Sequence, residues 1–215
     1  MGQMRTSINP GKVEWSGENP GIYLKENMHG DYTTLGLFFR IVLSPYGMGT
    51  GAIILGDPDT PSGWPHVPNF IISDNQRLFI WLIEGWVRKM PTFIGKVGLE
   101  HMTWIDLLGS TKHPTDLKTK YTETLIGKGV EVQMIWKDLG SPLPVELTQA
   151  NSVTKAHEMY AVFLEAQDAQ IMVNNTPLKG SVSSRHFFGK TMSTAFLALS
   201  ETWVTPIDMS TNHAT

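Results

Sequence analysis

The sequence of 215 residues contains no cysteine, and this absence removes several kinds of chemistry at once. Disulfide frameworks, zinc ribbons, iron–sulfur clusters and thiol nucleophiles all need cysteine, so each is excluded. The sequence also lacks an apolar run approaching the ~20 residues that a membrane-spanning helix requires. Its first residues, MGQMRTSINPGKVEW, carry no apolar stretch typical of a secretory signal. We therefore expect a cytoplasmic protein with no membrane partner.

Charge is sparse, and neither sign accumulates locally. Lys and Arg number 17 and Asp and Glu number 20, which gives a formal net charge of −3 and a pI near 6.1. No run of Lys or Arg exceeds two residues. A protein that binds phosphates normally carries a basic face or stripe. The sequence therefore predicts no nucleic acid partner.

The short motifs that hold common cofactors are missing. The sequence has no GxGxxG, no GxxxxGK[ST] and no GxSxG, so it predicts neither a nucleotide cofactor nor an α/β-hydrolase. Its 7 histidines are scattered and form no HxH or HxxxH pair. Ligands from distant strands could still converge, but the spacing itself predicts no metal site. We expect no bound organic cofactor.

Turn-forming residues are plentiful, with 20 glycines and 13 prolines. Between them lie short apolar or alternating segments that are typical of β-strands, from TTLGLFFRIVLS near residue 34 to TMSTAFLALSETWV near the C-terminus. Hairpin turns are expected around residues 45–51, 127–129 and 167–168. Residues 97–108 are expected to form a strand and residues 109–116 a polar loop.

These segments predict an α+β fold that is mainly antiparallel β. About eight to ten strands with hairpin spacing favour a barrel or a cone-like bent sheet. Residues 1–30 are polar and turn-rich, so we expect an N-terminal arm there. A single β-rich domain is expected over residues 31–215.

One amphipathic helix is expected at about residues 75–90. Ser73 and Asp74 are good N-cap residues, and Gln76 follows Ser73 at the spacing of a capping box. Pro91 ends the helix. Apolar positions recur every three or four residues, which predicts one buried face: Leu78, Trp81, Leu82, Gly85, Trp86 and Met90.

A closed sheet of about eight strands can enclose a cavity, and this geometry is the main link to function. Aromatic rings and thioethers adapt to apolar ligands, although ordinary core packing uses the same side chains. The candidate ligand-binding residues are Trp64, Trp81, Trp86, Met102, Trp104, Met159, Tyr160 and Trp203.

Two candidate acid–base residues lie near loops or strand ends. His66 lies in the proline-rich loop 56–69, where a stiff backbone could hold a general acid or base at a pocket mouth. His157 opens the strand HEMYAVFLE and could lie at a barrel rim. A structural role is the competing interpretation for both residues.

Two further candidates are carboxylates on apolar strand faces. Glu100 shares a strand face with Met102 and Trp104; if that face points inward, loss of solvent would raise the pKa of Glu100, and an exposed face is the competing interpretation. Glu201 is expected on the face of Leu197, Leu199 and Trp203 in the last strand, where a carboxylate must be paired, protonated or at the rim. The candidate partners of Glu201 are Arg40 and Arg185.

The segment VPNFIISDNQRLFIWLIEGWVRKMP (residues 67–91) resembles the strand, Asp-Asn and helix region of acetoacetate decarboxylase-like proteins. The resemblance implies a bent antiparallel β cone around a pocket and a Schiff-base lysine. The family's adjacent lysine pair is absent, because Lys89 is preceded by Arg88. A Schiff-base lysine usually needs a second cation beside it to lower its pKa.

The function that these features favour is binding of a hydrophobic or aromatic small molecule in a β-barrel pocket. Cofactor-independent isomerase, cyclase or lyase chemistry could accompany binding. The alternatives are an acetoacetate decarboxylase-like enzyme, a non-catalytic binding module, and an assembly protein whose aromatic patch is buried in a homodimer.

Overall fold

Strands account for most of the backbone in the computed structural model, which describes residues 11–116, 119–187 and 189–207. The helical segments of these residues are α1 (Gln76–Gly85), the 3-10 turn η1 (Val87–Lys89), α2 (Val97–Glu100) and the 3-10 turn η2 (Gln149–Asn151). The strands are β1 (Gly11–Glu18), β2 (Gly21–Lys25), β3 (Thr34–Leu43), β4 (Gly49–Leu55), β5 (Asn69–Ser73), β6 (Thr103–Asp116), β7 (Lys120–Gly127), β8 (Val130–Leu139), β9 (Leu143–Leu147), β10 (Glu158–Val173), β11 (Thr176–Pro177), β12 (Ser181–Val182), β13 (Ser184–Phe187), β14 (Lys190–Ser193) and β15 (Ala195–Pro206).

The main sheet closes on itself. Starting from β10, the hydrogen-bonded neighbours are β8, β7, β6, β5, β4, β3, β1 and β15, and β15 pairs again with β10. Only the pairing of β5 with β6 is parallel among the described strands. The prediction of a mainly antiparallel α+β fold with a barrel-like bent sheet is therefore confirmed.

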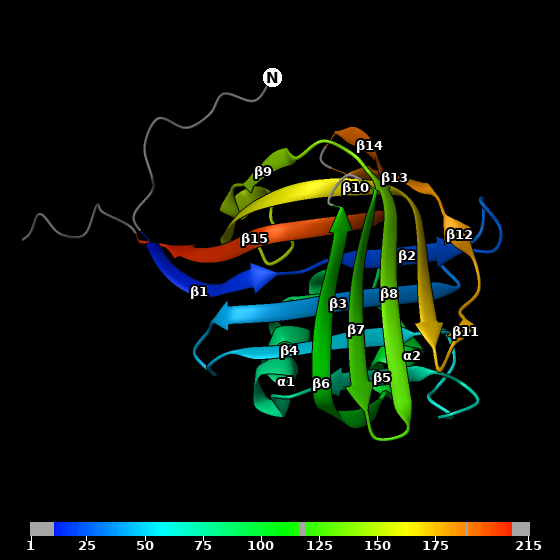
Figure 1. The fold of residues 1–215 in the computed structure, drawn as a ribbon. Helices are drawn as coiled ribbons and strands as arrows, with labels where there is room; N and C mark the ends of the chain where they lie inside the picture. Colours follow the sequence, from blue (N-terminus) through cyan, green and yellow to red (C-terminus); the bar gives the residue numbers. More distant parts are fainter. Residues whose placement is uncertain (1–10, 117–118, 188, 208–215) are drawn as a thin grey trace, which may run out of the picture.

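The closed sheet is flattened into two layers that cross (Figure 1). We call β6, β7 and β8 the front layer, and β1 to β5 with β15 the back layer. Side chains fill the space between them, and the largest include Phe38, Phe70, Tyr121 and Trp136. The interior is therefore a packed core rather than the hollow chamber that strand number alone suggests.

The outer face of the back layer is covered by the helical segments. Leu78, Phe79, Leu82 and Ile83 of α1 are buried against this face. Periodic apolar positions predicted the helix, but α1 ends at Gly85 and the chain continues as the 3-10 turn η1. No helix among the described residues is long and apolar enough to cross a membrane.

The helix cap differs from the one expected. Asn75, not Ser73 or Asp74, caps α1, because its side-chain oxygen accepts a hydrogen bond from the Leu78 N–H at 3.1 Å. Asp74 instead accepts from the Thr50 N–H at 2.7 Å. A cap of this kind contributes about 1 kcal/mol. The sequence predicted Ser73 or Asp74 as the cap, but the tertiary contact of Asp74 with Thr50 leaves this role to Asn75.

The β3–β4 hairpin and the β7–β8 hairpin around residues 127–129 are confirmed. Three other expectations are wrong. Residues 158–173 form the single strand β10, in which Asp168 pairs with Lys137 of β8 at 2.8 Å. Residues 109–116 extend β6. This part of β6 pairs only with β7, so the proline, which has no N–H, interrupts no hydrogen bonds to a second neighbouring strand. The start of segment 97–108 forms α2.

Residues 11–25 of the expected N-terminal arm lie in the sheet. β1 pairs with β15 and β3, and β2 pairs with β3 and β15. Trp15, Ile22 and Tyr23 are buried, and this apolar burial outweighs the polar, turn-rich composition around them. Residues 1–10 of that arm lie outside the described residues.

An ion-pair network joins β1 and β3 of the back layer to β7 of the front layer. Arg40 of β3 donates to both carboxylate oxygens of Glu123 on β7, at 2.9 and 2.7 Å, and to Glu18 at 2.5 Å. Tyr121 also donates to Glu123, which is fully buried. Arg40 therefore does not pair with Glu201, as the sequence allowed.

Replacing Arg40 with alanine should strongly destabilise the fold, because it leaves the Glu123 carboxylate buried without a cation. We expect Arg40→Ala to lower the free energy of unfolding by about 3–5 kcal/mol in a urea titration. Lys137→Ala removes an exposed ion pair and should cost about 1 kcal/mol or less. Equal losses in the two variants would contradict this assignment.

Candidate functional site

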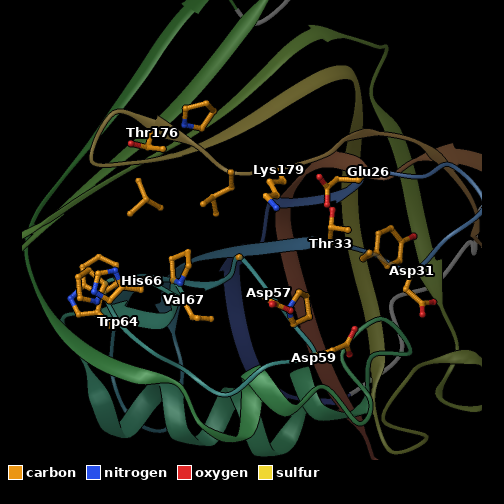
Figure 2. A pocket seen from close by; sticks show the side chains of 18 of the residues that line it. Glu26, Asp31, Thr33, Asp57, Asp59, Trp64, His66, Val67, Thr176 and Lys179 are labelled. Carbon is orange, nitrogen blue, oxygen red and sulfur yellow. The ribbon is translucent and has the colours of Figure 1, made fainter.

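An open cleft of about 870 Å³ lies at one end of the flattened barrel. Three segments line it: the β2–β3 turn at 26–33, the β4–β5 loop at 56–68, and residues 173–179 around the β10–β11 turn. Figure 2 shows side chains from these segments surrounding a common space. We refer to this site as the cleft.

Strand register brings the three segments together. Leu35 near the start of β3 pairs with Leu55 at the end of β4, and Leu55 pairs with Asn69 at the start of β5. The turn before β3 and the loop after β4 must therefore lie at the same end of the back layer. The Thr34 hydroxyl donates to the Lys179 carbonyl at 2.9 Å and attaches the third segment.

One buried amide holds the β4–β5 loop in shape. Asn69 is fully buried, and its side-chain nitrogen donates to the carbonyls of Asp57 and Thr60 at 2.6 and 2.7 Å. Its side-chain oxygen accepts from the Asp57 N–H at 3.1 Å. These bonds satisfy backbone groups that a loop with four prolines cannot pair regularly.

Helix α2 supports the same loop from outside. The Gly98 N–H donates to the Pro58 carbonyl at 2.8 Å, and Lys96 pairs with Asp59 at 2.9 Å. A Cβ atom at Gly98 would lie 2.7 Å from the Asn69 side-chain nitrogen. The loop is therefore positioned on two sides, which makes its contribution to the cleft well defined.

The chemistry of the cleft changes along its length. In Figure 2, Trp64, His66 and Thr176 lie at one end, and Glu26, Asp31 and Asp59 lie at the other. The lining also includes apolar side chains from the loop and from the β10–β11 region: Pro65, Val67, Pro68, Val173, Pro177 and Leu178.

The cleft contains two of the residues proposed from the sequence. Trp64 is half-buried, with its ring centroid 4.8 Å from that of Phe70 in the barrel core. It follows Gly63 and precedes Pro65 through a cis peptide bond. His66 is exposed in the same loop. Packed against Phe70, the indole of Trp64 offers an apolar surface to the cleft.

Three other proposed residues gather in a separate, smaller pocket of about 120 Å³. Glu100, Met102 and Trp104 line it where α2 leads into β6. Arg88 binds Glu100 and also Glu84. The Glu100 side chain is 45% exposed, so it is not the desolvated carboxylate that the strand pattern suggested.

Most of the remaining proposed residues form an aromatic layer between the back layer and the helical segments. Trp86 packs 6.1 Å from Trp15, 4.5 Å from Trp81 and 6.2 Å from Trp203, measured between ring centroids. His157 stacks on Trp86 at 5.3 Å. These side chains fill space, as does the buried Met159, and none of them lines the cleft or the smaller pocket.

His157, which directly precedes β10, and Tyr160 within β10 make local hydrogen bonds. The His157 ring nitrogen Nδ1 lies 2.9 Å from the Thr154 hydroxyl. Burial lowers the pKa of His157, an effect that Lys89 reinforces and Glu14 opposes. Tyr160 donates to the buried Glu158 at 2.6 Å, away from both pockets. Neither residue faces the cleft.

Glu201 is a buried carboxyl group in the aromatic layer. Its Oε1 accepts from the Trp203 indole at 2.6 Å and from the Asn19 amide at 3.5 Å. Burial raises its pKa to about 7, and these two hydrogen bonds act in the opposite direction. No salt bridge to Glu201 occurs among the described residues; Arg185 instead lies over the rings of Tyr23, Phe187 and Phe196.

A β-bulge explains why Glu201 and Trp203 do not share the face of Leu197 and Leu199. The pairing of β15 with β10 shifts register between Tyr160 and Val162, opposite Ser200, which has a φ of 53°. One extra residue inverts the alternation beyond it. Leu197 and Leu199 therefore pack in the barrel core, whereas Trp203 packs under the helical segments.

Several cleft residues were not identified from the sequence. Glu26, Asp31 and Lys179 come from loops whose approach depends on strand register. Asp57 and Asp59 could have been found, because they lie in the same proline-rich loop as His66. Among the residues that the structure describes, no three His, Asp or Glu side chains form a group able to hold a metal ion.

Changing Asn69 to aspartate should loosen the β4–β5 loop without changing side-chain size. The variant loses the two amide donors to the Asp57 and Thr60 carbonyls. We expect Asn69→Asp to reduce the unfolding free energy by about 1–3 kcal/mol and to speed amide hydrogen exchange in residues 56–68. Unchanged exchange in this loop would show that other contacts hold it.

The Glu201 carboxyl should make stability depend on pH. Its folded pKa of about 7 exceeds the value of 4.5 for a solvated glutamate, so between them the folded chain retains a proton that the unfolded chain releases. The stabilisation that protonated Glu201 contributes should be complete below pH 4.5, should decline as pH rises, and should be lost above about pH 7. It should amount to on the order of 3 kcal/mol.

Urea titrations of the wild type and of Glu201→Gln, at pH values below, between and above these two pKa values, measure this effect. The quantity to compare is the difference in unfolding free energy between the two proteins at each pH. The wild type should lose stability relative to the variant as pH rises. Glu84→Gln, at an exposed helix position, is the control and should follow the wild type. A constant difference between wild type and Glu201→Gln would contradict the assignment.

No protein-family model matches this sequence, and comparisons with curated proteins and with solved structures also found no significant match.

Proposed function

We propose that the protein binds a small molecule with an apolar or aromatic body in the cleft. The observation that carries this proposal is a concave site of about 870 Å³ whose lining combines an indole, prolines and aliphatic side chains with polar groups. Ligand sites typically have volumes of about 300–1,000 Å³ and a mainly apolar lining with a few polar groups.

The construction of the cleft supports binding by a preformed site. Asn69 and α2 hold the β4–β5 loop, and Thr34 holds the segment around Lys179. A rigid site binds with less loss of conformational freedom than a mobile one. Trp64 makes a T-shaped contact with Phe70 and is half-buried, so its remaining surface can contact a ligand.

Binding without chemistry is the form of this proposal that the geometry favours. His66 could act as a general acid or base for isomerase, cyclase or lyase chemistry, but no hydrogen bond among the described residues orients its ring. The decarboxylase alternative gains no support, because Lys89 is exposed and lies outside the cleft. Its neighbour Arg88 is paired with Glu84 and Glu100.

Binding of 2-phenylethanol, a neutral aromatic probe, tests the proposal. We expect titration of the ¹⁵N-labelled protein to shift the Trp64 indole N–H resonance and to leave that of Trp104 unchanged. Trp64→Ala should weaken binding about tenfold, because it removes the largest apolar wall. Trp104→Ala, which removes a 38% exposed indole outside the cleft, is the matched control.

Because Trp64→Ala also removes a contact with Phe70, a second variant keeps the test independent of folding. Thr176→Trp adds bulk at an exposed cleft position and should block the probe while the thermal unfolding midpoint stays unchanged. Binding that survives both variants would place the probe elsewhere and contradict the proposal.

A further inference from the structure

The ionisable groups of the cleft are strongly unbalanced in sign. Its 21 lining residues include four carboxylates and one ammonium group. The excess of three negative charges equals the formal net charge of −3 of the whole chain. A concave site with charge of one sign concentrates counter-ions and charged ligands of the opposite sign. The charge balance of the cleft therefore bears on the class of ligand.

Two of these four carboxylates have no side-chain partner of any kind among the described residues. Asp59 pairs with Lys96, and Asp57 accepts a hydrogen bond from the Thr60 hydroxyl at 2.8 Å. Glu26 and Asp31 form no salt bridge or side-chain hydrogen bond among the described residues. Both belong to the β2–β3 turn, so the two carboxylates without a side-chain partner lie on one wall of the cleft.

The unpaired charge and the apolar wall are separated in space. Glu26 and Asp31 lie at the opposite end of the cleft from Trp64, with Lys179 and Asp57 between them (Figure 2). A ligand that contacts both ends needs an apolar body and a polar head. The head faces carboxylates, which accept hydrogen bonds and attract positive charge.

An organic cation fits this arrangement better than a metal ion. Divalent metals bind where several carboxylate or imidazole groups converge, and no such group of three occurs among the described residues. An ammonium group needs no fixed coordination geometry and can form up to three hydrogen bonds with separate acceptors. The lining of the cleft includes one aromatic ring that contacts an ammonium group of the chain itself: the Lys25 Nζ lies 4.9 Å from the ring centroid of Tyr32.

We propose that the cleft selects amphipathic amines, with the apolar body toward Trp64 and the ammonium group toward Glu26 and Asp31. This inference rests on the proposed function, because it assigns a ligand class to the same site. Both carboxylates are exposed, so the attraction is moderate and screened by salt. Selectivity should therefore be measurable at low ionic strength and should decrease as salt is added.

Three probes of similar size and different charge test the inference on the full chain: 2-phenylethylamine, 2-phenylethanol and 3-phenylpropanoate. We expect the amine to bind about three- to tenfold more tightly than the alcohol at low salt, and the carboxylate to bind most weakly. The preference for the amine should largely disappear at about 0.5 M NaCl, because salt at this concentration screens most of the attraction between the ammonium group and the exposed carboxylates.

The double variant Glu26→Gln/Asp31→Asn should reduce amine binding to the level of the alcohol and leave alcohol binding unchanged. Glu84→Gln/Asp106→Asn removes two exposed carboxylates outside the cleft and serves as the control. It should retain the full preference for the amine. Both double variants alter exposed positions, so neither should change the unfolding midpoint.

The outcomes separate this inference from the proposed function. Equal binding of all three probes, weakened by Trp64→Ala, would overturn the amine preference and leave the cleft as a binding site. A preference for the amine that persists in Glu26→Gln/Asp31→Asn would also overturn it. If no probe binds at millimolar concentration, or if binding survives both Trp64→Ala and Thr176→Trp, the proposed function fails together with this inference.

Discussion

The cleft depends on the buried amide of Asn69. This side chain satisfies three backbone groups of a loop that contains four prolines and cannot join a sheet ladder. Its position at the start of β5 links the loop to the register of the back layer. A site made only of turns would be mobile, whereas a loop bonded to a buried strand residue keeps its shape at the edge of the core.

The tryptophans of the chain lie in different surroundings. Trp15, Trp81, Trp86 and Trp203 lie under the helical segments and contribute buried area and mutual ring contacts. Trp64 alone among the described tryptophans lines the cleft. Composition cannot predict which tryptophans are buried in the core and which line the cleft, because the indole ring suits both places. The separation comes from the layer to which each strand or loop belongs.

Much of the fold follows from the sequence, and the exceptions have physical causes. Local alternation and turn chemistry were sufficient for the hairpin at residues 127–129 and for α1. They failed for β10, because polar residues at 167–168 occupy exposed positions in a continuous strand. They also misplaced Glu201, because the bulge at Ser200 inverts the face that alternation assigns.

The candidate site was only partly predictable for a related reason. The four prolines of the β4–β5 loop indicated an irregular, exposed segment, and this reasoning found Trp64 and His66. Glu26 and Lys179 are separated by more than half of the chain, and they meet only because β2, β3 and the β10–β11 turn share one end of the barrel. Predicting that these residues lie close together requires the strand order, which cannot be read from periodicity or composition.

The long strand β10 has a structural consequence. It pairs with β15 and β9 along its first part and with β8 and β11 along its last part, so the same backbone belongs to both crossing layers. Together with the β5–β6 pairing, this strand joins the two layers through backbone hydrogen bonds. Val173, which lines the cleft, and Met159, which packs in the core under the helical segments, are thus near the two ends of one continuous hydrogen-bonded strand.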